Sequence, residues 1–349
     1  MLPFGVPELY HTSVYRLFAP RSRVPGRAWG AGPGRAPLYG AATLVLALTV
    51  FGRLPWDGLW ADTLTNAAHG PAFFILTLVL IALLGRSRSA GVSGARTWVM
   101  ALAVAILLGV LVELVQFVTG RDASMGDIWH DTIGAATAVG LVAALRRPDA
   151  DHGRRTRWAG LVVAVLGVMA MLAPVALTAA AYLHRWHSFP LLADPGSALY
   201  TYFLGTTPNL AVERVALPSH LIRPGEGRRG VRVRITDDAY WQLALREPVA
   251  DWRGHHHLNV DLANPTSEPL RVVLRLFDRP AGESGTRPGF RGVLLIAPHS
   301  RRITRIPLAD IGARTDGAPI DLARVHSVVI ARTRANRARE FFLAGLWLD

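Results

Sequence analysis

The chain has 349 residues, of which 51% are hydrophobic and 18% are charged, and its mean hydropathy is +0.27. Soluble domains carry about 25% charged residues, so this composition argues against a wholly soluble protein, and it excludes a disordered one. The formal net charge is +13, all 38 basic residues are arginine and cysteine is absent. Disulfides, thiolate metal ligands and a cysteine nucleophile are therefore excluded.

The first 37 residues are rich in arginine, proline and glycine. This composition predicts a flexible basic tail. The tail has neither the compact basic region nor the clean cleavage site of a signal peptide. We therefore expect the apolar segment that follows it to stay in the protein as a helix.

Five apolar segments follow, and each is a candidate membrane span because a span needs about 20 mainly apolar residues. They cover residues 38–54, 64–84, 97–118, 127–145 and 158–183. The fourth segment is the least apolar, since Asp127, His130 and Asp131 lie in its first turns. We expect an α-helical membrane bundle of about five transmembrane helices over residues 38–184.

Arginine is concentrated in alternate loops. It clusters in the N-terminal tail and in loops 85–96 and 146–157. By contrast, loop 55–63 contains no arginine and loop 119–126 contains only Arg121. Arginine-rich loops face the cytoplasm. The pattern predicts a multi-pass cell-membrane protein with a cytoplasmic N-terminus and an extracytoplasmic C-terminal domain. Because topology and contact with anionic membrane lipids explain the arginines, we expect no nucleic-acid partner.

The C-terminal part alternates between apolar and polar residues. Eight short segments are typical of strands separated by turns: 229–236, 240–247, 256–263, 270–278, 293–297, 302–308, 326–332 and 341–349. Many short strands without helices predict an all-β jelly-roll sandwich. We place this extracytoplasmic domain at 209–349 and treat 185–208 as a linker, with a lead-in strand within it as the alternative.

Ionisable residues inside membrane spans are costly and are therefore candidates for function. Three polar pairs each share one helical face: Asn66 with His69, Glu113 with Gln116, and Asp127 with Asp131. At about 1.5 Å per residue, all three pairs fall roughly 7 Å below the outer boundary. Arg121 lies in the loop beside them. This arrangement predicts a polar binding pocket near the outer leaflet.

Structural roles are the alternative for the same residues. Asp127 is placed to cap a helix, and Glu113 with Arg121 would form an ion pair. Asn66 and Gln116 would form hydrogen bonds between helices. For each residue taken alone these roles compete evenly with a functional one, and the shared depth of the set favours the pocket.

Two segments resemble the VanZ-like family of small integral membrane proteins. They are TLTNAAHGPAFFILTLVL (63–80) and GVLVELVQFVTGRDASMGDIWHDTIGAATAVG (109–140). The second is similar to the family's E-x-x-Q, an arginine after a short turn, and D-x-x-x-N-x-x-G. The matching positions are His69, Glu113, Gln116, Arg121, Asp127 and Gly134.

The sequence departs from the family pattern at two positions. Asn66 stands where the family has lysine, and Asp131 stands where it has asparagine. Both differences make the site more negative and argue against binding of an anion. The resemblance implies a bacterial envelope membrane protein, linked by family name to glycopeptide-antibiotic (teicoplanin) resistance, and it implies no particular reaction.

The C-terminal part resembles a galactose-binding-like jelly roll of the kind used as carbohydrate-binding modules. The resemblance rests on LNVDLANPTSEPLRVVLRLFD (258–278), RITRIPLADI (302–311) and EFFLAGLWLD (340–349). It implies a glycan ligand, for which exposed aromatic rings would be needed. The candidates are Tyr240, Trp241, Trp252 and Phe290.

Other chemistry has weaker support. The run His255 to His257 lacks the spacing and the carboxylate partners of a metal site, so we expect no metal and no cofactor.

The leading hypothesis is an envelope protein that binds a glycan or a lipid-linked sugar. The alternative is a membrane enzyme acting on a lipid-linked envelope precursor, with His69, Glu113 and Asp127 as acid–base groups. Transport is less favoured, because no inverted repeat is present.

Overall fold

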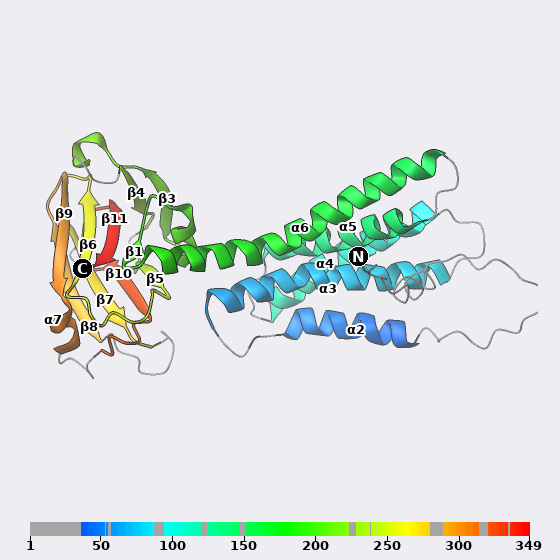
Figure 1. The fold of residues 1–349 in the computed structure, drawn as a ribbon, viewed down its shortest axis with the longest axis horizontal. Helices are drawn as coiled ribbons and strands as arrows, with labels where there is room; N and C mark the ends of the chain where they lie inside the picture. Colours follow the sequence, from blue (N-terminus) through cyan, green and yellow to red (C-terminus); the bar gives the residue numbers. More distant parts are fainter. Residues whose placement is uncertain are drawn as a thin grey trace, which may run out of the picture. The chain divides into compact units, whose positions relative to one another are not determined.

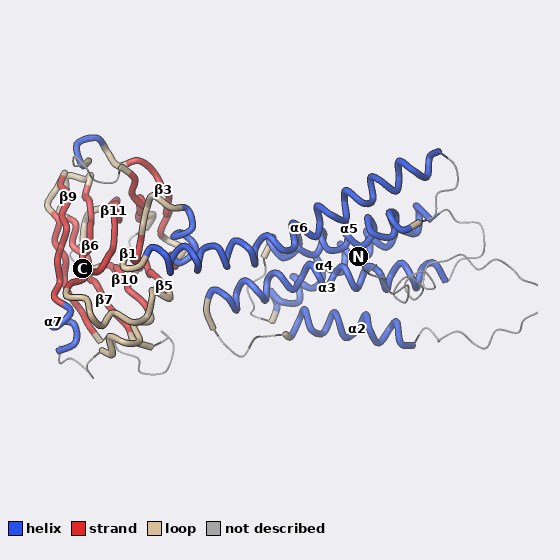
Figure 2. Tube along the Cα trace, viewed as in Figure 1, coloured by secondary structure: helices blue, strands red, loops and turns tan. Residues whose placement is uncertain are grey.

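The structure is a computed structural model. It describes residues 36–52, 54, 57–86, 94–119, 124–146, 151–222, 228–237, 239–279, 289–313, 320–333 and 336–349. The chain divides into two compact units, Met1–Ala176 and Leu177–Asp349 (Figure 1). Long helices make up the first unit and strands dominate the second, which confirms the expected fold class of a helical bundle followed by a β-sandwich (Figure 2).

Five helices are described in the N-terminal part: α2 Ala36–Phe51, α3 Leu59–Arg86, α4 Gly94–Val118, α5 Met125–Leu145 and α6 Asp151–Ser188. Four of these, α3 to α6, are long and apolar enough to cross a membrane. α2 has 16 residues and is about 24 Å long, whereas the hydrocarbon core of a bilayer is about 30 Å thick. The expected count of about five spans therefore becomes four full-length candidates and one shorter apolar helix.

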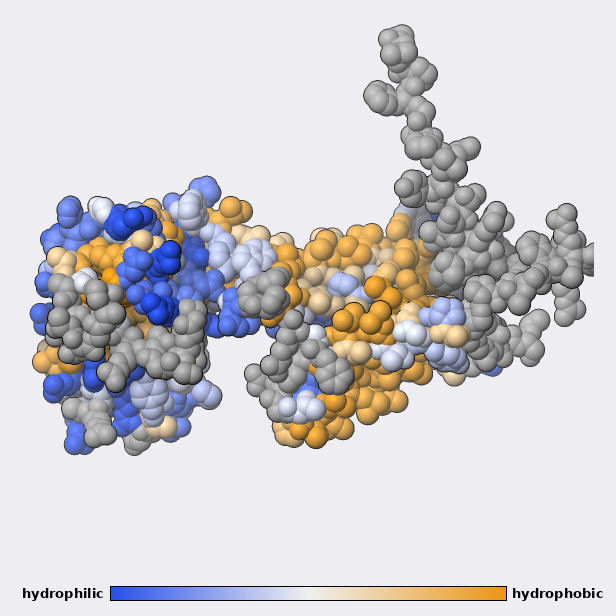
Figure 3. All heavy atoms as spheres, turned by 90° about the horizontal axis from the view of Figure 1, so that it is seen from below, coloured by the Kyte–Doolittle hydropathy of each residue, from blue (hydrophilic) through white to orange (hydrophobic). Residues whose placement is uncertain are grey.

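The outward surfaces of these helices are apolar. Leu107, Leu114 and Phe117 on α4 are more than half exposed, as are Leu166 and Met169 on α6. In the space-filling view, hydrophobic residues cover most of the described surface of the helical unit (Figure 3). A continuous apolar surface of this kind is typical of a face that contacts lipid or another protein.

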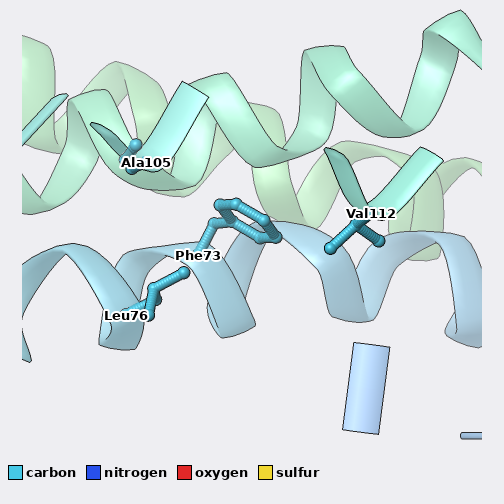
Figure 4. Close-up of a cluster of buried hydrophobic side chains, with 5 residues drawn as sticks. Phe73, Leu76, Ala105 and Val112 are labelled. Carbon is cyan, nitrogen blue, oxygen red and sulfur yellow. The ribbon is translucent and has the colours of Figure 1, made fainter. Parts of the chain in front are cut away.

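Small residues and a hydrophobic cluster around Phe73 hold the helices together. Phe73 projects from α3 toward α4, which carries Ala105 and Val112 (Figure 4). Elsewhere the backbones themselves touch. A side chain at Gly134 of α5 would overlap the carbonyl oxygen of Gly70 on α3. Only glycine permits this approach, so α3 and α5 are packed backbone to backbone.

The second unit is a sandwich of two antiparallel sheets. One sheet has the order β3 (Leu210–Ala216), β4 (Arg229–Ile235), β11 (Glu340–Leu348), β6 (His257–Asn264), β9 (Ser300–Pro307), and β1 (Leu191–Ala193) also pairs with β11. The other has the order β2 (Leu204–Thr206), β5 (Gln242–Arg246), β10 (Ser327–Arg332), β7 (Leu270–Phe277), β8 (Phe290–Ile296). All eight predicted strand segments correspond to strands of these two sheets.

Residues 185–208 are integrated into this unit, although the sequence suggested a linker. They contain β1, β2 and the short helix η2 (Ala198–Phe203). The last turns of α6 pack on η2: Arg185 is buried, with its guanidinium 4.0 Å from the centre of the Phe203 ring and 4.6 Å from that of Tyr182. The Tyr182 hydroxyl donates to the Glu247 carboxylate. Within the second unit, the last turns of α6 therefore pack on the sandwich through buried side chains.

Candidate functional site

The polar residues of the helical unit gather where α3, α4 and α5 meet. His69 on α3 and Asp131 on α5 are buried, and Nδ1 of His69 donates to Oδ1 of Asp131 at 3.0 Å. Gly109 on α4 makes room for this pair, because an added Cβ there would lie 2.8 Å from Oδ2 of Asp131. Three helices thus enclose one His–Asp pair.

Glu113 lies one helical turn beyond Gly109 on α4 and holds the start of α5. Its Oε2 accepts a hydrogen bond from the backbone N–H of Ser124 at 2.7 Å. Ser124 is the N-cap of α5, and its hydroxyl accepts from the N–H of Gly126. A carboxylate at this position interacts favourably with the helix dipole. Glu113 therefore has a structural role at the N-terminus of α5, in addition to any functional one.

Asp127 completes the cluster. It lies in the first turn of α5 and is buried. Its charge interacts with His69, Glu113 and Asp131, so the four ionisable side chains are neighbours. We call them the bundle cluster.

Two acceptor atoms of the bundle cluster have no partner among the residues that the structure describes. Oε1 of Glu113 and Oδ2 of Asp131 are buried without a hydrogen bond in the described part of the chain. Buried acceptors without partners are rare because they lose hydration without compensation. They are therefore available to bind a proton, a water molecule or a polar ligand group.

The remaining predicted pocket residues are placed differently. Gln116 is buried and donates from Nε2 to the carbonyl of Thr49 at 3.2 Å, which ties α4 to α2. Asn66 is exposed on α3. Arg121 lies outside the described residues. Gln116 therefore behaves as an interhelical hydrogen-bonding residue, and the bundle cluster contains four of the seven predicted positions.

A second candidate surface is the outer face of the five-stranded sheet. Strand alternation turns Ala244, Val329 and Ala331 outward, and the register places Val329 directly between Ala244 and Arg275. Val273, Val329 and Ala331 form a buried apolar cluster at the centre of this face. We call these three buried residues the apolar floor of this face.

Polar and aromatic groups surround this floor. The Tyr240 ring is 51% exposed, and its hydroxyl accepts from Nη1 of Arg275 at 3.0 Å and donates to Oε1 of Gln242 at 3.1 Å. Nε of Arg275 is buried without a partner among the described residues. We call Tyr240, Gln242 and Arg275, together with the apolar floor, the sheet face.

The other three aromatic candidates point inward. Trp241, Trp252 and Phe290 are 1%, 0% and 5% exposed, and Trp241 stacks on Phe341 with ring centres 5.6 Å apart. Their rings fill the core, so they are not available on the surface for a glycan. Gln242 and Arg275 did not emerge from the sequence, although the alternation of QLALR in β5 already turns Gln242 outward.

The histidine run contacts other parts of the sandwich. His257 pairs with the carboxylate of Asp349, Nδ1 to Oδ1, at 2.9 Å, and the His255 ring packs edge-on against Phe189. Among the residues that the structure describes, no group of three or more His, Asp or Glu side chains is arranged to hold a metal ion.

No family model and no curated protein matches this sequence. Among solved structures, the chain is similar to the family 11 carbohydrate-binding module from Clostridium thermocellum in complex with a β-1,3-1,4-mixed-linked tetrasaccharide. The identity is 20%, the match covers 45% of this chain and 93% of that one, and the TM-score is 0.33.

The chain is also similar to two other solved structures. TmCBM61 in complex with β-1,4-galactotriose is 12% identical over 42% of this chain and 86% of that one, with a TM-score of 0.25. An exo-β-agarase is 10% identical over 42% of this chain and 23% of that one, with a TM-score of 0.33. These likenesses are distant, and the bound sugars belong to those proteins.

Proposed function

We propose that this chain is a multi-pass membrane protein of the bacterial cell envelope whose sandwich binds a glycan outside the membrane. The observation that carries the proposal is the sheet face, where the exposed Tyr240 ring stands beside Arg275 and Gln242 over an apolar floor. The arginine-rich loops of the sequence support the sidedness, and four helices long and apolar enough to cross a membrane support the anchoring.

The chemistry of the sheet face suits a sugar. A sugar ring offers C–H groups on its faces and hydroxyls around its edge, and a tyrosine ring has an apolar body with a polar tip. The Arg275–Tyr240–Gln242 hydrogen bonds hold that ring in one orientation, which lowers the entropic cost of binding.

The test is direct binding of the purified full-length protein in detergent to neutral oligosaccharides and envelope polysaccharides. We expect Tyr240→Ala to abolish binding and Tyr240→Phe to retain most of it, because phenylalanine keeps the ring and loses only the hydroxyl. Equal binding by wild type and Tyr240→Ala would reject the sheet face as the site. Absence of binding to every glycan tested would reject the proposal itself.

The VanZ-like resemblance concerns the bundle cluster, for which we propose binding of the polar part of a lipid-linked sugar. Oε1 of Glu113 and Oδ2 of Asp131, which have no hydrogen-bond partner in the described part of the chain, support this because they can accept from hydroxyl groups. We expect the double variant Glu113→Ala/Asp127→Ala to lose binding of lipid-linked sugars. Unchanged binding in a variant that remains folded would exclude the cluster.

A second candidate function is an enzyme acting on a lipid-linked envelope precursor. It is favoured by the His69–Asp131 pair, because a carboxylate that holds Nδ1–H orients the imidazole and leaves Nε2 to accept a proton. Turnover of such a precursor by the reconstituted protein should fall about a hundredfold or more in His69→Gln. The exposed His187→Gln is the matched control, and equal turnover in both variants would remove the enzyme hypothesis.

A further inference from the structure

A cleft of about 520 Å³ lies at one end of the sandwich. Its lining includes Trp241 at the start of β5, Glu268 in the β6–β7 loop, and Arg332, Arg337 and Arg339 around the β10–β11 connection. The Trp241 side chain is turned toward the core, whereas Tyr240 next to it belongs to the sheet face. The cleft is therefore a separate site from the sheet face.

The lining has an excess of positive charge, with three arginines against one glutamate. Arg337 makes no hydrogen bond or ion pair within the described residues, and neither does the Glu268 carboxylate. Both side chains are exposed. Because they do not neutralise each other, both are available to a ligand.

The framework of the cleft is fixed by its other residues. Arg332 donates from Nη1 to the carbonyl of Ala239 at 3.0 Å. The Asn336 side chain accepts from the N–H of Arg271 at 3.0 Å and donates to the carbonyl of Ala338 at 2.9 Å. Asn336 therefore holds the segment that carries Arg337 and Arg339, and these arginines extend from an ordered backbone.

We propose that this cleft binds the carboxylate of an acidic sugar. Arginine is suited to a carboxylate because its planar group donates two parallel hydrogen bonds. Glu268 is an acceptor for sugar hydroxyls and would repel a more highly charged phosphate group. The volume lies within the range of about 300–1,000 Å³ of small-molecule sites, which is enough for one or two sugar residues. This site is independent of the glycan proposed for the sheet face.

The experiment titrates the full-length protein carrying Tyr240→Ala, in which the sheet face is removed, with digalacturonate and with the neutral digalactoside of the same linkage in detergent. The two probes differ only at C6 of each sugar, which is a carboxylate in digalacturonate and a hydroxymethyl group in the digalactoside. We expect binding of digalacturonate alone, weakened by added salt because the arginines are exposed. We expect Arg337→Gln to weaken that binding about tenfold or more, since a hydrogen bond to a charged group is lost. Arg229→Gln, an exposed arginine at the opposite end of β4, is the matched control and should bind like wild type.

Three results would overturn the proposal: no binding of digalacturonate, equal binding of both probes, or equal affinity in Arg337→Gln and wild type. Tighter binding of galactose 6-phosphate than of galacturonate would assign the cleft to phosphate instead. Glu268→Gln provides a second test at an exposed position: because it removes the charge that opposes phosphate, it should reduce the preference for galacturonate over galactose 6-phosphate. Tyr240→Ala should leave digalacturonate binding intact, which separates this site from the sheet face.

Discussion

Asp261 and Arg301 form an ion pair inside the sandwich, between neighbouring strands β6 and β9. Their side chains are 3% and 5% exposed, and the guanidinium donates to both carboxylate oxygens, with Nη2 to Oδ2 at 2.6 Å and Nε to Oδ1 at 3.0 Å. Burying two charges is costly, so a buried ion pair contributes little net stability, but loss of one partner leaves the other charge buried without compensation.

Removing one partner of this pair should therefore be strongly destabilising. We expect Arg301→Met to lower the free energy of unfolding by about 3–5 kcal/mol, because Asp261 is left buried and unpaired. The exposed pair of Arg324 with Asp321 offers the control, and Arg324→Met should change it by less than about 1 kcal/mol. Chemical denaturation of both variants measures the difference, and equal stabilities would contradict the expectation.

Tyr200 should make the stability of the sandwich sensitive to alkali. Burial raises the pKa of Tyr200 to about 12, while its hydroxyl donates to the carbonyl of Leu191 at 2.6 Å. The unfolded chain ionises this group near its ordinary pKa of about 10. Its contribution is thus complete below about pH 10 and is lost as the pH rises toward about 12.

The measurement is thermal unfolding between pH 9 and 12, in wild type and in Tyr200→Phe. The chain has no lysine and no cysteine, so its seven tyrosines are the main side chains that titrate in this range. We expect the melting temperature to fall with pH less steeply in the variant. Identical pH profiles would show that Tyr200 ionises equally in the folded and unfolded states.

Individual side chains were the hardest features to predict. Tyr240 and Trp241 are adjacent aromatic residues, and nothing in the sequence favoured one over the other as a glycan-binding ring. Yet Tyr240 is 51% exposed and Trp241 is 1% exposed. Alternation along a strand fixes that they point to opposite faces, but only the second sheet determines which face is buried. The same holds for Asn66 and His69, since both belong to one predicted helical face and only His69 meets α5.

At the scale of elements, the contact between α3 and α5 depends on glycine. We expect Gly134→Ala to destabilise or misassemble the helical unit, because its Cβ would overlap the carbonyl of Gly70. Gly85→Ala on α3 is the matched control, since nothing lies within 4 Å of the added Cβ. Yield and melting temperature in detergent measure the effect, and equal behaviour of the two variants would refute it.

Most long elements with a clear period were predictable, although the seven-residue strand β3 was missed, and the shortest strands were not predictable. The 25-residue α4 and the eight alternating strand segments follow from hydrophobic pattern alone. β1 and β2 have three residues each, too few to show alternation, and they are strands only because β11 and β5 offer them backbone partners. α2 was predictable as an apolar helix, but whether 16 residues cross a membrane depends on the local bilayer.

At the scale of the whole molecule, the membrane topology is the main open prediction. We expect α3 to α6 each to cross the membrane, in which case residues 57 and 349 lie on one side and loops 87–93 and 147–150 on the other. We expect reporters fused after residue 90 to lie in the cytoplasm and reporters fused after residue 349 to lie outside. A C-terminal reporter in the cytoplasm would overturn the extracytoplasmic assignment of both proposed glycan sites.

An N-terminal tag decides the role of α2 in the same assay. The arginine-rich segment before α2 predicts that the tag lies in the cytoplasm. In that case α2 crosses the membrane as a fifth, short span. A tag on the outside would mean that α2 lies along the bundle without crossing.

The glycine contacts of α5 have a consequence for how its backbone exchanges hydrogen with the solvent. α5 touches α3 at Gly134, and it touches α6 at Gly140, where an added Cβ would lie 2.9 Å from the carbonyl oxygen of Gly160. Neighbouring helices thus shield α5 from two sides, whereas α4 exposes much of its length. Amide hydrogens in the middle of α5 should be replaced by deuterium more slowly than those of the other helices in the bundle. The backbone hydrogen bonds around Asp131 should therefore open least often.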